Sequence, residues 1–435
     1  MDRLVISGGA PLRGKVGVSG AKNAALPLMA ASILSLEPLV LENVPPLGDL
    51  GTMGKLLAHM GGSVRMSSGG DPGTPETAVL DMGNLDKPEA PHELVKTMRA
   101  SALVLGPLLA RVGRARVSLP GGCAIGVRPI DMHLKALKDM GAEFDLSGGD
   151  IVAKAPGGFL RGAKIRFDTV TVTGTEHIMM AAALARGTTV IRNAAREPEV
   201  SDTGRALVKM GARIEGLGTD EIVVEGVPSL SSATHAVMSD RIEAGTLIAA
   251  AAAAGGKITL TGAPLSAMEA VLGKFGEAGL VFEILANENG GREGKDLVVS
   301  SPGGRLLAAD ATTMPHPGFP TDMQAQFMAA MTLADGVSII TETIFENRFM
   351  HVAELRRLGA DITLEGRSAV VKGAKKLSGA PLTASDLRAS AGLLIAALAA
   401  DGVSRLSRVY HLDRGYDRLD LKLNLLGADI TREKE

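Results

Sequence analysis

The chain has 435 residues, of which 46% are hydrophobic and 22% charged, and its net charge is −2. These values are typical of a globular protein of about two to four domains, and they give no sign of the basic surface that nucleic acids or membranes require. Aromatic residues make up only 3%, so base stacking is not expected, and the presence of a single cysteine excludes an intramolecular disulfide.

The first segment, MDRLVISGGAPL, alternates between apolar and polar residues as a strand does. It has neither the basic nor the apolar region of a secretion signal. The longest apolar run, residues 247–254, is too short to span a bilayer. We therefore expect a cytoplasmic protein that does not bind membranes.

Two sequence patterns then alternate along the chain, and each occurs six times. The first is an almost wholly apolar helix followed by a strand, in residues 26–44, 102–122, 178–194, 245–263, 327–345 and 392–410. The second is an amphipathic helix end, a glycine and a short strand, with the glycine at positions 61, 141, 211, 279, 359 and 427. Glycine is favoured just after a helix, so we expect each of these residues to be a left-handed cap.

A helix that is apolar all round must be buried on every side. The repeats therefore predict an α/β fold of two globules, each with three units, in which sheets surround the buried helices. TIM-barrel and doubly wound folds come second, because neither explains a sixfold period. Three repeat glycines precede residue 239 and three follow it. We expect one domain over residues 22–238 and a second over residues 1–21 plus 239–435.

The starts of the apolar helices combine an N-cap former with a charged residue: SGAKN, TMRAS, TGTEH, SDRIE, PTDMQ and SDLRAS. Helix capping alone would explain why Asp322 and Glu176 stand at helix starts. It does not account for Lys22, Arg99 and Arg388, because cations oppose the positive end of a helix dipole. These cations favour an anion at the helix starts, where phosphate groups commonly bind.

The single cysteine, Cys123, lies in the glycine-rich stretch LPGGCAIGVRPIDMH. A lone cysteine is either a small buried residue or a reacting group, and the residues alone leave both open. Arg128, Arg348 and Arg414 are individually typical of surface residues, although arginine also grips phosphate or carboxylate bidentately. There is no P-loop, dinucleotide fingerprint or metal-ligand spacing, so no cofactor and no metal is expected.

Taken in order, several long motifs resemble the UDP-N-acetylglucosamine 1-carboxyvinyltransferase family of enolpyruvyl transferases. They are SGAKNAALPLMAA, TMRAS, PGGCAIGVRPIDMH, TVTGTE, NAAREPEV, PHPGFPTDMQAQ, FENRFMH, SDLRAS and DRGYDR. The resemblance runs essentially end to end. It implies a two-domain inside-out α/β barrel, built from six βαβαββ-like units, with the active site in the cleft between the domains.

The family reaction transfers the enolpyruvyl group of phosphoenolpyruvate to the 3′-hydroxyl of UDP-N-acetylglucosamine, the first committed step of peptidoglycan synthesis. The resemblance assigns Lys22 and Arg414 to the phosphate of phosphoenolpyruvate and Asp322 to the base at the sugar hydroxyl. Cys123 matches the proton donor, which also forms a covalent phosphothioketal adduct with phosphoenolpyruvate and is alkylated by fosfomycin. The remaining matched substrate-binding residues are Asn23, Arg99, Arg128, Pro129, Ile130, Asp131, Met132, Ile344, Arg348, Asp386 and Arg388.

Two other functions stay open on the sequence. One is 3-phosphoshikimate 1-carboxyvinyltransferase, which shares the fold and the enolpyruvyl donor, although the Cys123 loop and SGAKN argue against it. The other is a non-catalytic paralogue that binds a UDP-sugar.

Overall fold

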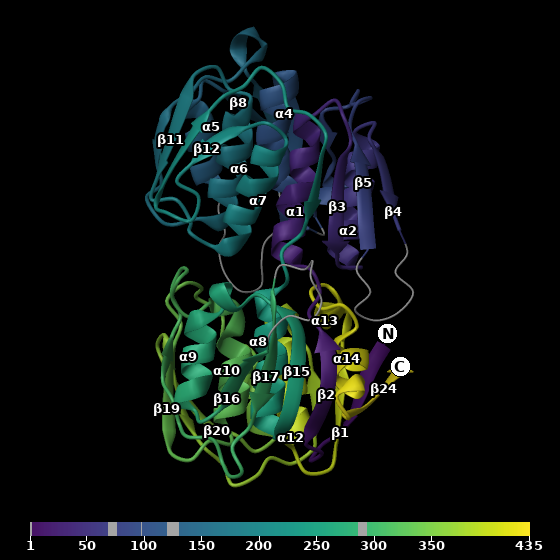
Figure 1. Ribbon diagram of the computed structural model, residues 1–435, viewed down its shortest axis with the longest axis vertical. Coiled ribbons are helices and arrows are strands. Elements are labelled where there is room, and N and C mark those ends of the chain that lie inside the picture. The colour runs from purple at the N-terminus through teal and green to yellow at the C-terminus, as the bar shows by residue number, and fades with distance from the viewer. Residues whose placement is uncertain (1, 68–75, 97, 120–129, 286–293) are drawn as a thin grey trace.

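The computed structural model describes residues 2–67, 76–96, 98–119, 130–285 and 294–435. Figure 1 shows two lobes, stacked one above the other, with helices inside and sheets outside. The two ends of the chain lie side by side on the lower lobe (Figure 1).

The described residues form six four-stranded sheets of the same design. Each sheet has one parallel strand pair at one edge, and its other two pairings are antiparallel. Three sheets belong to the upper lobe: β14 (Ala233–Ala236), β3 (Leu39–Val44), β5 (Glu76–Asp81), β4 (Ser63–Met66); β6 (Glu89–Ala90), β7 (Arg114–Ser118), β9 (Asp150–Lys154), β8 (Glu143–Ser147); and β10 (Lys164–Arg166), β11 (Thr188–Arg192), β13 (Glu221–Glu225), β12 (Arg213–Glu215).

The lower lobe holds the other three sheets, and the first and last of these include strands from the N-terminus. They are β2 (Leu12–Gly17), β15 (Gly256–Ala263), β17 (Lys295–Ser300), β16 (Val281–Leu285); β18 (Ala311–Thr312), β19 (Val337–Thr341), β21 (Ser368–Lys372), β20 (Asp361–Glu365); and β22 (Pro381–Thr383), β23 (Val403–Ser407), β1 (Asp2–Ser7), β24 (Asp429–Lys434). Separate mixed sheets of this kind match neither a TIM barrel nor a doubly wound sheet.

The apolar helices fill the centre of each lobe, as their composition predicts. They are α1 (Lys22–Ala31), α4 (Leu105–Val112) and α6 (Val172–Ala183) above, and α8 (Arg241–Ala254), α10 (Gln324–Met331) and α12 (Leu387–Ala399) below. Small side chains let these helices approach closely: a Cβ on Gly392 of α12 would lie 2.8 Å from the backbone oxygen of Ala325 in α10. Within the described residues, no helix combines the length and apolarity needed to cross a membrane.

A second helix in each unit lies at the edge of the core. These are α2 (Gly48–His59), α5 (Asp131–Asp139), α7 (Pro198–Lys209), α9 (Glu269–Glu277), α11 (Val352–Arg357) and α14 (Leu419–Leu425), while α3 (His92–Val95) and α13 (Tyr410–Asp413) are short additions. All six repeat glycines follow these helices with φ between 90° and 106°, which confirms the expected left-handed caps.

The capping prediction is only partly right. Thr171, Asp240 and Asp386 cap α6, α8 and α12 with their side chains. At α1 the N-cap is Ala21, and the short 3-10 helices before α4 and α10 begin after Met98 and Pro320, none of which supplies a side-chain cap. The polar residues in SGAKN and PTDMQ therefore do not cap their helices, contrary to the expectation.

Two hydrophobic cores are separate. One runs from Ala21 to Met238 and also includes Ala267, and the other joins residues 4–18 to residues 242–430. Where the chain passes between them, Gly20 and Ser239 form an antiparallel bridge, with the Ala21 amide 2.7 Å from the Met238 oxygen. We propose on this basis the domain boundaries drawn from the sequence.

Candidate active site

Lys22 and Arg414 come from different cores and meet at one carboxylate. Lys22 is the first residue of α1 and is buried, and its Nζ lies 2.8 Å from Oδ2 of Asp49, in the first turn of α2. Arg414, just after α13, places its Nε 3.1 Å from Oδ1 of Asp49, and its backbone oxygen accepts a 3.0 Å hydrogen bond from Lys22. Burial lowers the pKa of Lys22, while Asp49 opposes this shift. The two predicted phosphate-binding cations are thus adjacent.

A second cluster surrounds Asp322, which lies in the 3-10 helix Thr321–Met323. Arg348 Nη2 is 2.6 Å from Oδ1, and Arg388 Nη2 is 3.0 Å from Oδ2. Both arginines are buried, but the Asp322 side chain keeps 26% exposure. Two guanidinium groups thus contact the two oxygens of a carboxylate that is still partly exposed. The cluster therefore orients Asp322 with one edge toward solvent.

The two clusters are electrostatically connected. Arg388 contributes to the lowered pKa of Lys22, after burial, and Asp322 helps to keep Arg388 charged. Asp386 accepts hydrogen bonds from the amides of Arg388 and Ala389, so its observed contact is the cap of α12. The cap holds Arg388 at the helix start, where the sequence predicts an anion.

The structure describes the other predicted site residues to different extents. Asn23 is exposed beside Lys22, and Ile130, Asp131 and Met132 form the start of α5. The amide of Ile344 donates to the buried Glu342 carboxylate over 2.8 Å. The backbone of Arg99 begins the 3-10 helix Arg99–Val104. Cys123, Arg128 and Pro129 lie outside the described residues.

Sequence reasoning missed a third charged group between the lobes. Arg241 of α8 pairs with both carboxylate oxygens of Glu199 in α7, at 2.9 and 3.2 Å, and the amide of His316 donates to Glu197 over 3.2 Å. Burial raises the pKa of Glu197 and lowers that of His316. NAAREPEV and SDRIE contain three of these residues, but neither motif predicts which cation meets which carboxylate.

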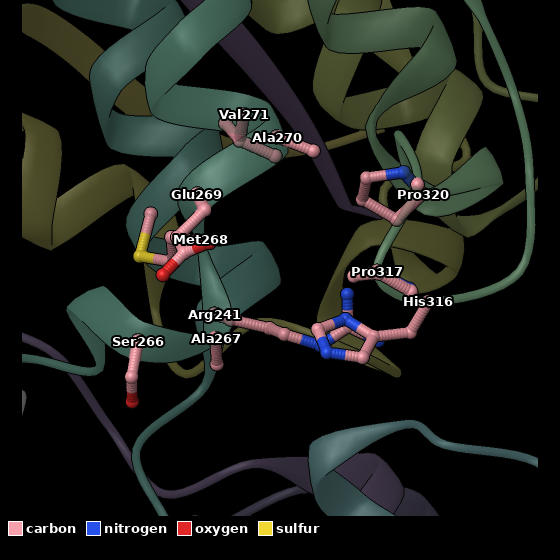
Figure 2. Close-up of a pocket in the computed structure, with 11 residues that line it drawn as sticks. Arg241, Ser266, Ala267, Met268, Glu269, Ala270, Val271, His316, Pro317 and Pro320 are labelled. Atoms are coloured by element: carbon pink, nitrogen blue, oxygen red, sulfur yellow. The ribbon is translucent and has the colours of Figure 1, made fainter. Parts of the chain in front are cut away.

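A small pocket of about 50 Å³ adjoins this group, lined by Arg241, Ser266, Glu269, His316 and neighbouring residues. Figure 2 shows the Arg241 side chain and the His316 ring entering it from opposite sides. Among the described residues that line it, none is a predicted site residue, although Pro320 connects it to the Asp322 segment. No metal-binding group of three or more His, Cys, Asp or Glu side chains occurs in the described part of the chain.

Comparisons with known proteins place the chain in a family. The model of the EPSP synthase (3-phosphoshikimate 1-carboxyvinyltransferase) family matches residues 6–423. A UDP-N-acetylglucosamine 1-carboxyvinyltransferase of Anaeromyxobacter dehalogenans is 58% identical over 432 residues, 99% of each chain, and one of Nitratidesulfovibrio vulgaris is 54% identical over 435 residues, 100% of each. The chain belongs to the UDP-N-acetylglucosamine 1-carboxyvinyltransferases, within the EPSP synthase family. The resemblance read from its motifs is confirmed.

Solved structures confirm the fold class. The enolpyruvyl transferase NikO from Streptomyces tendae superposes with a TM-score of 0.87 and 26% identity, over 100% of this chain and 99% of that one. An EPSP synthase from Acinetobacter baumannii, at 17% identity and a TM-score of 0.73 over 100% of both chains, shares the fold alone. Members of this family are enzymes, and the two-domain inside-out barrel is their common architecture.

Proposed function

We propose that the protein transfers the enolpyruvyl group of phosphoenolpyruvate to the 3′-hydroxyl of UDP-N-acetylglucosamine and releases phosphate. The observation that carries this proposal is the convergence of Lys22, Arg414, Arg388 and Arg348 around two carboxylates between the lobes, in a chain of this family. Such a cationic surface suits a small, highly charged anion. The reaction begins peptidoglycan precursor synthesis, and a cytoplasmic location belongs to the same proposal.

The residue types suit an addition followed by an elimination. Protonation of C3 of phosphoenolpyruvate makes C2 electrophilic, and the sugar oxygen attacks C2 while its proton passes to a base. C3 of the resulting ketal then loses a proton, the C2–O bond to phosphate breaks, and the vinyl ether forms with the P–O bonds intact. The path needs an acid, a base and a cationic phosphate site. We assign these roles to Cys123, Asp322 and the pair Lys22 and Arg414.

The remaining matched residues are proposed to bind UDP-N-acetylglucosamine. Arg99, Arg128 and the segment from Pro129 to Met132 lie on the first domain as proposed above, as does Asn23, which is proposed to lie beside both substrates. Ile344, Arg348, Asp386 and Arg388 lie on the second. A substrate that touches both sets would explain why the candidate residues are divided between two cores.

The test is phosphate release from phosphoenolpyruvate with each acceptor. We expect release with UDP-N-acetylglucosamine and none with shikimate 3-phosphate or without acceptor. Release only with shikimate 3-phosphate would support the other transferase. Binding of UDP-N-acetylglucosamine without release would support the non-catalytic paralogue, and either result would overturn the proposal.

Cys123 supplies a separate prediction. Fosfomycin is an epoxide that a thiolate opens, so the wild-type protein should gain one inhibitor mass. Cys123→Asp keeps an ionisable acid and should retain enolpyruvyl transfer, but it should gain no adduct. Intact-mass spectrometry of both proteins checks this. An unmodified wild type, or an adduct on the Asp variant, would contradict the role given to Cys123.

A further inference from the structure

Asp49 has no role in the reaction proposed above, yet it contacts both cations assigned to the phosphate. Its Oδ2 lies 2.8 Å from Lys22 Nζ, and its Oδ1 lies 3.1 Å from Arg414 Nε. The Asp49 side chain is 9% exposed, whereas that of Arg414 is 47% exposed. A buried carboxylate thus pairs with a half-exposed arginine side chain that reaches it from the other lobe.

We infer that Asp49 is a positioning residue, which sets Lys22 and Arg414 side by side as one phosphate site before the substrate binds. This inference rests on the proposed function. An ammonium group has three protons. Among the described contacts, Lys22 directs one proton to Asp49 and one to the Arg414 backbone oxygen, so the third can still reach an anion. Without Asp49, the Lys22 side chain would have no described carboxylate in contact, and the long Arg414 side chain would lose its ion pair with this carboxylate.

Charge supports the same conclusion. The charged groups that act on Lys22 are Asp49 of α2, Arg388 of α12 and Arg414 after α13, and burial together with both arginines lowers the pKa of Lys22. Asp49 is the group that opposes this shift. It therefore helps to keep Lys22 protonated in a site that otherwise repels an ammonium ion.

The chain provides a matched control in Asp420. Like Asp49, it is the second residue of an edge helix, is buried, and pairs with an arginine: Asp420 Oδ2 lies 3.0 Å from Arg432 Nε. Its partner Arg432 is on β24 and also pairs with Asp413 over 2.8 Å, so Asp413 still holds Arg432 when Asp420 is changed. Asp420→Asn therefore reproduces the loss of a first-turn carboxylate and its ion pair, at a carboxylate whose ion pair is with Arg432.

The experiment compares Asp49→Asn with Asp420→Asn and wild type. Loss of hydrogen bonds to charged groups predicts a KM for phosphoenolpyruvate raised by about 10-fold to 100-fold in Asp49→Asn. The Kd for UDP-N-acetylglucosamine should change by less than about 3-fold, which is within the usual spread for a site left intact. In Asp49→Asn, Lys22 loses the carboxylate that raises its pKa, so Lys22 should lose its proton at a lower pH. The fall in kcat/KM for phosphoenolpyruvate at alkaline pH should therefore begin at a lower pH than in wild type. Asp420→Asn should match wild type in all three measurements.

Each outcome separates the hypotheses. If the wild-type protein shows no transfer activity, the proposed function is wrong. That result does not contradict the pairing of Asp49 with Lys22 and Arg414. An active wild type with an unchanged KM and pH profile in Asp49→Asn overturns the positioning role. If Asp49→Asn does not fold, Asp49→Ser replaces it, because Ser removes the charge with a smaller polar side chain. If neither neutral variant folds while Asp420→Asn does, Asp49 is structural and the inference is wrong.

Discussion

Asp322→Asn is expected to lower kcat by about 10²–10⁴-fold, the usual contribution of a general base. The amide has the shape of the carboxylate but cannot take a proton from the sugar hydroxyl. Arg348 and Arg388 hold the carboxylate oxygens at 2.6 and 3.0 Å, so its position is set before substrate arrives. Steady-state kinetics with saturating phosphoenolpyruvate and UDP-N-acetylglucosamine measures the loss.

Binding must be measured alongside turnover. Calorimetric titration should give a Kd for UDP-N-acetylglucosamine within about 10-fold of wild type, because the base acts mainly in the transition state. Asp361→Asn, an exposed carboxylate on β20, is the control and should leave kcat unchanged. A variant at Asp322 that keeps more than about a tenth of the wild-type rate would remove this residue from the role of base.

The second large effect is expected on stability, at Lys422 of α14. This side chain is fully buried, and its Nζ lies 2.6 Å from both Glu243 Oε1 and Ser19 Oγ. Lys422→Met would leave the Glu243 carboxylate buried without its cation. Removing one partner of a buried ion pair costs about 3–5 kcal/mol. Urea titration should show a decrease of this size in the free energy of unfolding.

A double variant and a pH series make that test specific. Lys422→Met with Glu243→Gln should recover most of the loss, because a neutral pair needs no counter-charge. Burial already raises the pKa of Glu243 above its usual 4.5, with Lys422 opposing, so the single variant should raise it further. A carboxyl group with a raised folded-state pKa loses stability at higher pH and regains it as the pH falls. The deficit should therefore be larger at about pH 8 than at about pH 5, and equal deficits would contradict this explanation.

The sequence by itself determined the architecture. Burial patterns repeat locally, so the six apolar helices, the six glycine caps and the division into two cores could all be inferred from periodicity. The cations at helix starts, such as Lys22 and Arg388, could be identified because they oppose the helix dipole, and the family followed from whole motifs rather than from single residues.

The tertiary structure alone decided which charges meet. Asp49 and Arg414 are 365 positions apart, and Asp322 and Arg388 are 66 apart, yet each pair forms a contact between helix starts or adjoining turns. The same holds for Arg241 with Glu199, and for Lys422 with Glu243. An ion pair carries no periodic signal, because its partners are selected only when packed cores bring the ends of their helices together. Asp49 therefore looks in the sequence like any first-turn carboxylate, and its place between Lys22 and Arg414 emerges only from the fold.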